Sequence, residues 1–192
     1  RSLVNYHMQE LLPASIDYAK EIGADKIVVF SFEKSSKLLE SIPDEVLENL
    51  SWATQQAEKS GIQLVVEVED HFWADTGKNT AEIIRKINQP AIGVNWDPGN
   101  AIVAGDIPYP NGYQQVREFI RHVHFKDVVI LPQDGYRYDV NGQIDWAGQI
   151  QALIADGYSG YISVEPHMQP KVASAKALFL RLKELIVTAK NI

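Results

Sequence analysis

The sequence predicts an α/β fold in which successive βα units build a parallel sheet. Two observations predict it. Five short runs rich in β-branched and apolar residues alternate with amphipathic stretches of helical length. Three of those stretches end in a glycine suited to a left-handed C-cap, at Gly23, Gly61 and Gly157. Because the chain has no linker rich in Gly, Ser or Pro, we expect a single domain over residues 1–192.

The expected strands and helices follow one another in regular order. The strands are KIVVFSF (26–32), IQLVVEVE (62–69), AIGVNWD (91–97), HVHFKD (122–127) and GYISVEP (160–166). The helices are expected at 7–22, 44–60, 78–88, 112–121, 145–156 and 170–189. Residues 128–143 are expected to form a long loop, and long loops in compact domains often carry function.

Local signals support several of these boundaries. Thr76 or Thr80 can cap the helix expected at 78–88. Pro98 restricts φ and Gly99 permits a positive φ, so the chain can turn sharply at this point. The turn places Asp97 at the tip of its strand.

Composition excludes several classes of protein. The 192 residues are 45% hydrophobic, as in a globular protein, and their net charge of −7 argues against a surface that neutralises phosphates. Nucleic acid is therefore not an expected partner. The absence of cysteine excludes disulfides and thiolate ligands, so any metal site uses His, Asp and Glu. No run approaches the roughly 18 apolar residues of a membrane span, and we expect a cytoplasmic protein with no membrane partner.

Polar side chains end four successive strands. Side chains alternate along a strand, so positions two apart share a face. On one face this parity places Glu67 and Glu69, Asn95 and Asp97, His122, His124 and Lys126, and Ser163, Glu165 and His167. Strands of parallel sheets are normally apolar on both faces, and a buried carboxylate is costly. Because four strands end in polar residues on the same face, we expect one shared site, at the edge where α/β sheets and barrels bind ligands.

The strand ends offer three carboxylates and an imidazole, from Glu67, Asp97, His124 and Glu165. Each has an ordinary alternative, such as a solvated strand end for a glutamate or a hydrogen-bonded structural role for His124. Adjacent carboxylates without a cation repel one another, so together they predict a bound divalent metal. The donor set suits Mg²⁺ or Mn²⁺, and the imidazole extends the choice to Co²⁺, Fe²⁺ or Zn²⁺.

Several other residues near these positions have two possible roles. His122, one pleat deeper than His124, is expected to be a core histidine or a support for it. Lys126 is either a pocket cation or a surface ion pair with Asp127. Phe72 and Trp73 either wall a ligand pocket or pack at the rim of the fold. Arg137, in the loop at 128–143, is a candidate contact for an anionic or hydroxylated substrate.

The order of the motifs along the chain carries a family resemblance. LVVEVE, GVNWDPGN, HVHFKD, a helix opened by Asp-Trp, and GYSGYISVEPH follow in sequence. Together they resemble the xylose isomerase-like superfamily of sugar phosphate isomerases and epimerases. The resemblance implies a (β/α)8 TIM barrel, of which this chain supplies about five βα units, strands four to eight.

The resemblance also implies roles for named residues. It assigns a divalent metal, namely Mn, Mg, Co or Zn, to Glu67, Asp97, His124 and Glu165. In the ketose epimerase members the two metal-bound glutamates also move the substrate proton, so Glu67 and Glu165 are the expected catalytic pair. A lysine after the ligand histidine, here Lys126, is a frequent feature of the site.

Two positions depart from the family pattern. Members often carry a substrate-binding histidine three residues after the aspartate ligand, where this chain has Asn100. They often carry a second histidine at the position two residues after the first glutamate ligand, where this chain has Glu69. We expect Asn100, Glu69, Lys126 and Arg137 to contact the substrate, whose identity these departures leave open.

The expected function is that of a metal-dependent isomerase or epimerase of a small sugar or polyol-derived ketose, with a glutamate moving the proton α to a carbonyl. A dehydratase of an inosose-type substrate and a non-catalytic, metal-stabilised sugar-binding module are the alternatives. A nuclease of this fold is disfavoured because Asn100 and Asn141 stand where its extra histidines would lie. The resemblance implies three preceding βα units, and a sheet without them leaves open edges, so we expect a homo-oligomer or another covering element.

Overall fold

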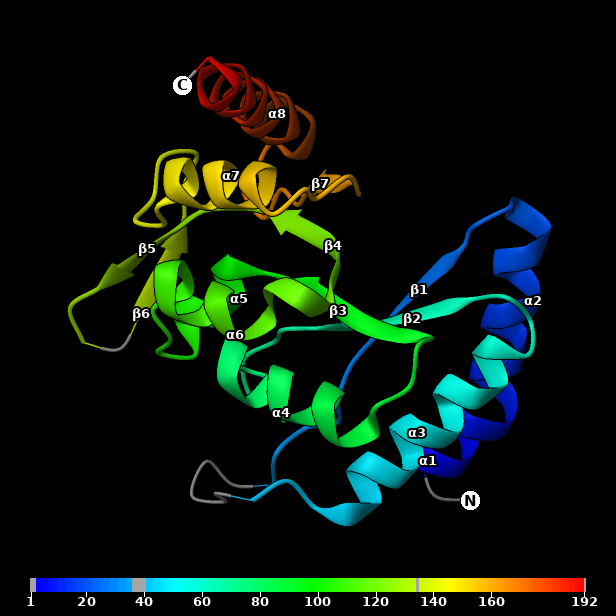
Figure 1. The fold of residues 1–192 in the computed structure, drawn as a ribbon. Coiled ribbons are helices and arrows are strands. Elements are labelled where there is room, and N and C mark those ends of the chain that lie inside the picture. Colours follow the sequence, from blue (N-terminus) through cyan, green and yellow to red (C-terminus); the bar gives the residue numbers. More distant parts are fainter. Residues whose placement is uncertain (1–2, 36–40, 134, 192) are drawn as a thin grey trace.

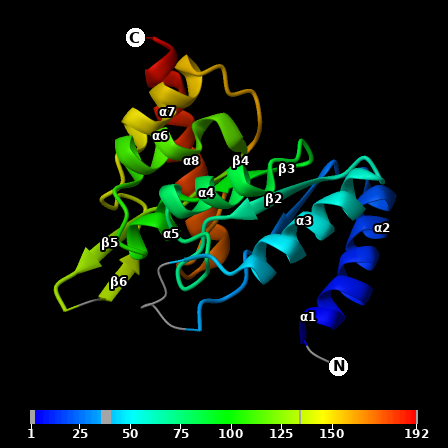
Figure 2. The ribbon, with the colours of Figure 1, turned by 60° about the horizontal axis from the view of Figure 1, so that its bottom comes forward.

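The structure is a computed structural model that describes residues 3–35, 41–133 and 135–191. Its main sheet contains five strands, β1 (Lys26–Val29), β2 (Gln63–Glu67), β3 (Ile92–Trp96), β4 (Ile120–Phe125) and β7 (Ile162–Val164). Their order is β1-β2-β3-β4-β7, and every neighbouring pair is parallel. Figure 1 and Figure 2 show the sheet twisted and curled, with helices arranged around it. The five expected strands and the parallel sheet are confirmed.

Helices precede and connect the strands. Before β1 lie α1 (Leu3–Tyr6), the π-helical turn η1 (His7–Leu11) and α2 (Leu12–Ile22). The connections contain α3 (Asp44–Glu58), α4 (Gly77–Ile87), α5 (Pro98–Val103), the turn η2 (Pro108–Gly112), α6 (Tyr113–Val116) and the 3₁₀ turn η3 (Arg117–Phe119). After β4 come α7 (Trp146–Ala155) and α8 (Lys171–Lys190).

The predicted helix boundaries rest on identifiable caps. Gly23, Gly61 and Gly157 have φ of 72°, 70° and 73°, the left-handed conformation expected where each helix ends. Thr76 is the N-cap of α4 and its side chain accepts a hydrogen bond from Asn79 N. These local signals place the strands that follow.

The core lies between the sheet and the helices. Strands β2 and β3 are buried along almost their whole length, as in a sheet covered on both sides. Two tryptophans join the layers: Trp96 Nε1 donates to Gln149 Oε1 at 2.9 Å, and Trp146 Nε1 donates to the carbonyl of Lys126 at 2.9 Å. The second bond ties α7 to the end of β4 and so holds the backbone at Lys126.

Two expectations about the chain between β3 and α7 were wrong. The segment 112–121 is not one helix, because Ile120 already belongs to β4. It is buried there and pairs with Val94 of β3. Burial of this β-branched residue outweighs the helical pattern before it. The segment 128–143 is not a simple loop, because it contains an antiparallel hairpin of β5 (Val128–Leu131) and β6 (Gly135–Tyr138). The β-branched residues of β5 and the two tyrosines of β6 favour this pairing.

The two outer strands of the main sheet each have one open edge. Within the described ranges, β1 pairs only with β2, and β7 pairs only with β4. Apolar side chains are exposed near both edges, including Val28 (42%) and Phe30 (48%) beside β1 and Tyr161 (82%) beside β7. No helix in the described part of the chain is long and apolar enough to cross a membrane.

Candidate metal centre

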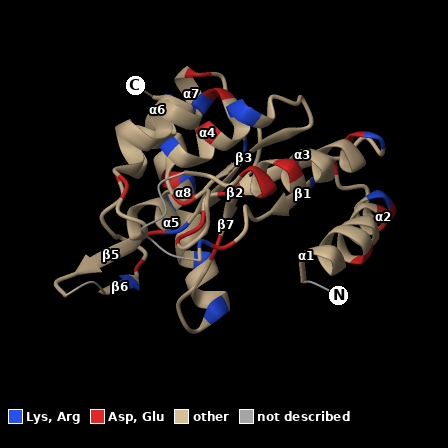
Figure 3. Ribbon diagram, turned by 90° about the horizontal axis from the view of Figure 1, so that it is seen from below, with Lys and Arg blue, Asp and Glu red and all other residues tan. Residues whose placement is uncertain are grey.

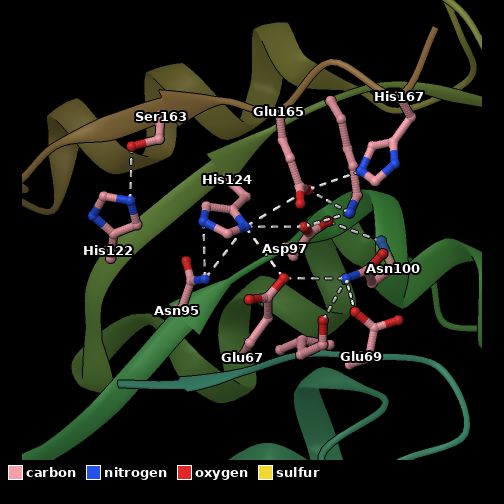
Figure 4. A network of polar contacts seen from close by, with 12 residues as sticks. Glu67, Glu69, Asn95, Asp97, Asn100, His122, His124, Ser163, Glu165 and His167 are labelled. Carbon is pink, nitrogen blue, oxygen red and sulfur yellow. Dashed lines mark hydrogen bonds and ion pairs between the residues drawn. The ribbon is translucent and has the colours of Figure 1, made fainter. Parts of the chain in front are cut away.

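Four side chains from neighbouring strand ends converge on one point. Glu67 ends β2, Asp97 follows β3, His124 lies in β4 and Glu165 follows β7. Each offers one ligand atom, and these atoms all lie within 4.8 Å of one another. His124 Nδ1 is 3.2 Å from Glu67 Oε1 and 3.5 Å from Asp97 Oδ2. The same nitrogen is 3.7 Å from Glu165 Oε2, and Figure 4 shows the group. The four predicted metal ligands are therefore brought together.

Asp97 is held by the helix that it begins. It is the N-cap of α5, and its Oδ1 accepts a hydrogen bond from Asn100 N at 2.9 Å. Its Oδ2 is buried and has no well-directed hydrogen bond from the described residues, although the Lys126 Nζ atom lies 2.9 Å away. One oxygen is thus anchored while the other faces the cluster. Gly99 makes room, since a Cβ there would lie 2.6 Å from Lys126 Cγ.

Lys126 lies inside the cluster. Its Nζ is 2.9 Å from Asp97 Oδ2 and 2.6 Å from Glu165 Oε2, and its side chain is only 3% exposed. Burial lowers the pKa of Lys126, but the two carboxylates outweigh it and raise the pKa above its usual value. For Glu165 the directions are reversed: burial raises its pKa, but the charge of Lys126 outweighs burial and lowers the pKa to about 2.

The surface-pair reading of Lys126 and Asp127 is wrong. Asp127 Oδ2 instead pairs with Arg181 Nη1 of α8 at 2.6 Å, and its Oδ1 accepts from the backbone of Val128 and Ile144. Asp127 therefore joins the hairpin to the last helix. Lys126 is left to face the carboxylates.

His124 contacts several polar side chains. Burial lowers its pKa, but hydrogen bonds to Asp97 and Glu67 outweigh it and raise the pKa to about 10. Asn95 Nδ2 lies 3.3 Å from Nδ1 and 3.2 Å from Nε2 of the ring. His122 packs its ring edge-on against His124 at a centroid distance of 5.5 Å and contacts Ser163 Oγ at 2.9 Å. His122 thus contacts His124, as the second of its two predicted roles requires, and that role stays a prediction.

Asn100 and Glu69 lie beside the cluster. Asn100 Nδ2 is 2.9 Å from Glu69 Oε2, 2.9 Å from the carbonyl of Val68 and 3.5 Å from Glu67 Oε1. Burial raises the pKa of Glu69 to about 7; Lys126 opposes this shift, and the neighbouring carboxylates add to it. The two positions that depart from the family pattern therefore contact each other and adjoin a predicted ligand.

The hairpin contributes a residue that sequence reasoning did not assign. Tyr138 of β6 stacks on His167, with ring centroids 4.2 Å apart and planes 15° apart. His167 Nε2 in turn lies 3.3 Å from Glu165 Oε2. The alternation of Tyr136 and Tyr138 was the available signal, because it is typical of a strand.

Three other candidates lie elsewhere. The side chain of Arg137 is 55% exposed and its ion pair is with Asp139, not with the cluster. Trp73 is 4% exposed and belongs to the core, so it packs rather than walls a pocket. Phe72 contacts Phe30, with centroids 5.2 Å apart, near the open edge of β1.

The donor set fits a divalent metal. Asp97 and Glu67 are buried, His124 and Glu165 are partly buried, and all four ligand atoms face one volume. Oxygen and imidazole ligands of this kind bind Mg²⁺, Mn²⁺, Co²⁺ or Zn²⁺. Asp97 Oδ2, which has no well-directed hydrogen bond among the described residues, faces this volume and could serve as a ligand atom.

Comparison with known proteins decides the family. The sequence model of the xylose isomerase-like TIM barrels matches residues 9–184. The chain belongs to the xylose isomerase-like TIM barrel family. Its five-stranded curled sheet is accordingly part of a TIM barrel, which confirms the predicted fold class.

Relatives in this family have several names. An inosose dehydratase of Bacillus licheniformis is 26% identical over 193 residues, covering 84% of this chain and 63% of that protein. The chain thus spans less than two thirds of that relative. A xylose isomerase domain protein from Planctomyces limnophilus has a TM-score of 0.78 at 21% identity, covering 95% of this chain and 67% of the other.

Two further solved structures share this fold. A xylose isomerase-like protein from Mycobacterium smegmatis, in complex with magnesium, has a TM-score of 0.76 at 18% identity, covering 98% and 70% of the two chains. An L-ribulose 3-epimerase has a TM-score of 0.73 at 17% identity, covering 95% and 68%. Family members thus include enzymes, among them an epimerase and a dehydratase.

Proposed function

We propose that this chain carries the active site of a metal-dependent isomerase or epimerase that acts on a small sugar or polyol-derived ketose. The observation that carries the proposal is the convergence of Glu67, Asp97, His124 and Glu165 at four strand ends. A bound divalent cation would polarise a substrate carbonyl and the hydroxyl beside it. The protein residues then position the substrate and move its proton.

Glu67 and Glu165 are the proposed proton carriers. They come from β2 and β7, and Figure 4 shows them approaching the centre of the cluster from different sides, with Asp97 between them. One carboxylate takes the proton from the carbon α to the carbonyl, and the C–H electron pair moves toward the carbonyl oxygen. The other, in its protonated form, gives its proton to that carbon from the opposite face, and the carbonyl re-forms. Alternatively the proton goes to the former carbonyl carbon, while the hydroxyl on the first carbon loses its proton to the first carboxylate and becomes the new carbonyl. The first outcome is epimerisation and the second is isomerisation.

The neighbours of the two glutamates hold them in place. Lys126 and His167 both contact Glu165 Oε2, and Asn100 lies against Glu67 and Glu69. We propose that Asn100, Glu69 and Lys126 meet substrate oxygens, because each places a polar group beside the cluster. Arg137 reaches the substrate only if its pair with Asp139 opens.

Dehydration is the second candidate. The relative from Bacillus licheniformis is named an inosose dehydratase, and the first step, loss of the proton α to the carbonyl, is shared. Lys126 and His167 beside Glu165 are cationic or protonatable groups that could protonate a departing hydroxyl. A product lighter by one water would separate dehydration from isomerisation, and failure to turn over any sugar would favour a non-catalytic sugar-binding module.

The test uses the protein with metal in D₂O and a panel of ketohexoses, ketopentoses and inososes. Deuterium should enter the carbon next to the carbonyl. Glu67→Gln and Glu165→Gln keep the side-chain shape and remove the base, which typically costs about 10² to 10⁴ in rate. Each variant is first shown to retain metal. Exchange that persists in both metal-loaded variants would remove these residues from the catalytic role.

We also propose a homo-oligomer, a cytoplasmic location and no nucleic-acid partner. The open edges of β1 and β7, with exposed Val28, Phe30 and Tyr161, support association. Figure 3 shows Lys and Arg spread over several helices and loops, and the net charge of −7 disfavours phosphate binding. Sedimentation velocity checks the assembly, and a stable monomer with no tendency to associate would contradict it.

A further inference from the structure

We infer that Tyr138 is a positioning residue of the active site, because its ring stacks on the imidazole of His167 and holds that imidazole beside Glu165. The inference rests on the role proposed above for Glu165 as a proton carrier. Tyr138 lies in β6 of the hairpin, outside the main sheet, whereas Glu165 and His167 follow β7. The hairpin thus supplies a residue to a site that the main sheet builds.

The rings of Tyr138 and His167 are stacked face to face. Their centroids are 4.2 Å apart and their planes differ by 15°. His167 lies in the irregular segment between β7 and α8, and its side chain is 32% exposed. In the described ranges its ring and ion-pair contacts are with Tyr138 and Glu165. Because exposed side chains exchange rotamers within nanoseconds, the stack is what keeps the imidazole in one orientation.

Tyr138 itself lies at the anchored end of the hairpin. It pairs with Val128, which is fully buried in the core. The next residue, Asp139, donates its backbone N–H to the carbonyl of Asp127 at 3.0 Å. The carboxylate of Asp127 is in turn held by Arg181 of α8 at 2.6 Å. The ring of Tyr138 is therefore supported by a part of the chain that is fixed to the core.

His167 and Lys126 contact the same oxygen of Glu165. Nε2 of His167 is 3.3 Å from Oε2, as Figure 4 shows, and Nζ of Lys126 is 2.6 Å from it. Every ion pair and side-chain hydrogen bond of the Glu165 carboxylate in the described part of the chain involves Oε2, so Oε1 remains available to substrate or metal. The Glu165 side chain is 33% exposed, so these contacts rather than close packing hold it. A displacement of about 1 Å at a reacting group can cost about 10²-fold in rate.

The test compares three variants of the metal-loaded protein on the panel of ketohexoses, ketopentoses and inososes. Tyr138→Leu removes the ring and should lower kcat about 10- to 100-fold at unchanged KM and metal content, because the loss falls on proton transfer. Tyr138→Phe keeps a stacked ring and should retain the wild-type kcat. Tyr136→Leu is the matched control and should also retain it, because the Tyr136 ring meets Tyr138 edge-on at 5.5 Å and does not stack on His167.

Two further measurements separate positioning from a general loss of structure. In ¹H NMR the ring current of the stacked partner should shift the His167 ring protons upfield in the wild-type protein and in Tyr138→Phe, and Tyr138→Leu should lose this shift. The double variant Tyr138→Leu/His167→Leu should be no slower than His167→Leu alone, because Tyr138 acts through His167.

Three results would overturn the inference. They are a kcat of Tyr138→Leu equal to that of Tyr136→Leu, a double variant whose two losses add, and His167 ring protons that Tyr138→Leu leaves unshifted. If Tyr138→Leu does not fold, nuclear Overhauser contacts between the two rings in the wild-type protein decide, and their absence overturns the inference. Wild-type protein that turns over no sugar of the panel would remove the proposed function together with this inference. Undiminished turnover by Tyr138→Leu would remove the inference alone.

Discussion

Lys126→Met deletes an ammonium that lies between two carboxylates. Nζ is 2.9 Å from Asp97 Oδ2 and 2.6 Å from Glu165 Oε2, and the side chain is 3% exposed. Methionine is also unbranched and flexible, so most of the contact of the side-chain stem with Gly99 is retained. The substitution therefore tests the charge of Lys126 more than its shape.

The expected loss follows from the geometry of the pair. At an effective dielectric of about 20, unit charges at this distance attract by roughly 6 kcal/mol before any desolvation cost. Breaking a buried pair costs a net amount of about 3–5 kcal/mol. Glu165 is 33% exposed and partly screened, so most of the loss belongs to Asp97, which is 0% exposed. In a domain of this size the melting temperature should fall by roughly 6–20 °C.

Thermal unfolding with chelator and with saturating Mn²⁺ or Zn²⁺ is the assay. Without metal, Lys126→Met should lose the full amount; with metal, most of it should return, because the cation replaces the missing positive charge. Arg181→Met is the matched control. It breaks an equally short pair to Asp127, whose side chain is 0% exposed, outside the cluster. That variant should be destabilised to the same extent with and without metal.

The charge argument has a clear refutation. If Lys126→Met were destabilised equally in chelator and in metal, the ammonium would not be compensating the ligand carboxylates. A metal affinity below that of the wild-type protein would lead to the same conclusion, because removal of a competing cation should strengthen binding.

Further predictions concern the two histidines. His124→Ala should lower the metal content of protein purified without chelator, and an unchanged elemental analysis would contradict its role as a ligand. In metal-free protein burial lowers the pKa of His124, but Asp97 and Glu67 outweigh it and raise the pKa to about 10. Its contribution to stability is therefore full below about pH 6.5 and is lost as pH rises through about 10. Metal must displace this proton, so metal affinity should rise by up to about tenfold per pH unit between about pH 6.5 and about pH 10. Calorimetry of metal binding in two buffers should detect proton release, and its absence would refute this prediction. His167→Leu removes the imidazole 3.3 Å from Glu165 Oε2 and should lower turnover about 10- to 100-fold at unchanged metal content; equal loss of both would indicate a structural role.

The sequence by itself determined the five strands of the main sheet and the candidate ligand set. Apolar runs that end in polar residues of one parity are a local property of the chain, so Glu67, Asp97, His124 and Glu165 could be assigned to a common face before any pairing was known. The glycine caps were equally local, because a positive φ depends on the residue itself. For this reason the order of strands and helices was largely predictable.

Only the tertiary structure decided which polar groups meet. Parity placed Lys126 on the ligand face, but its contact with Asp97 and Glu165 depends on how β3, β4 and β7 lie side by side. The sequence allowed Asp127 to pair with Lys126. In the structure its partner is Arg181 of α8, which lies 54 residues away along the chain. Tyr138 reaches His167 because β6 folds back on β5. Sequence spacing specifies the face on which a side chain lies, whereas its partner depends on distances between elements that are remote along the chain.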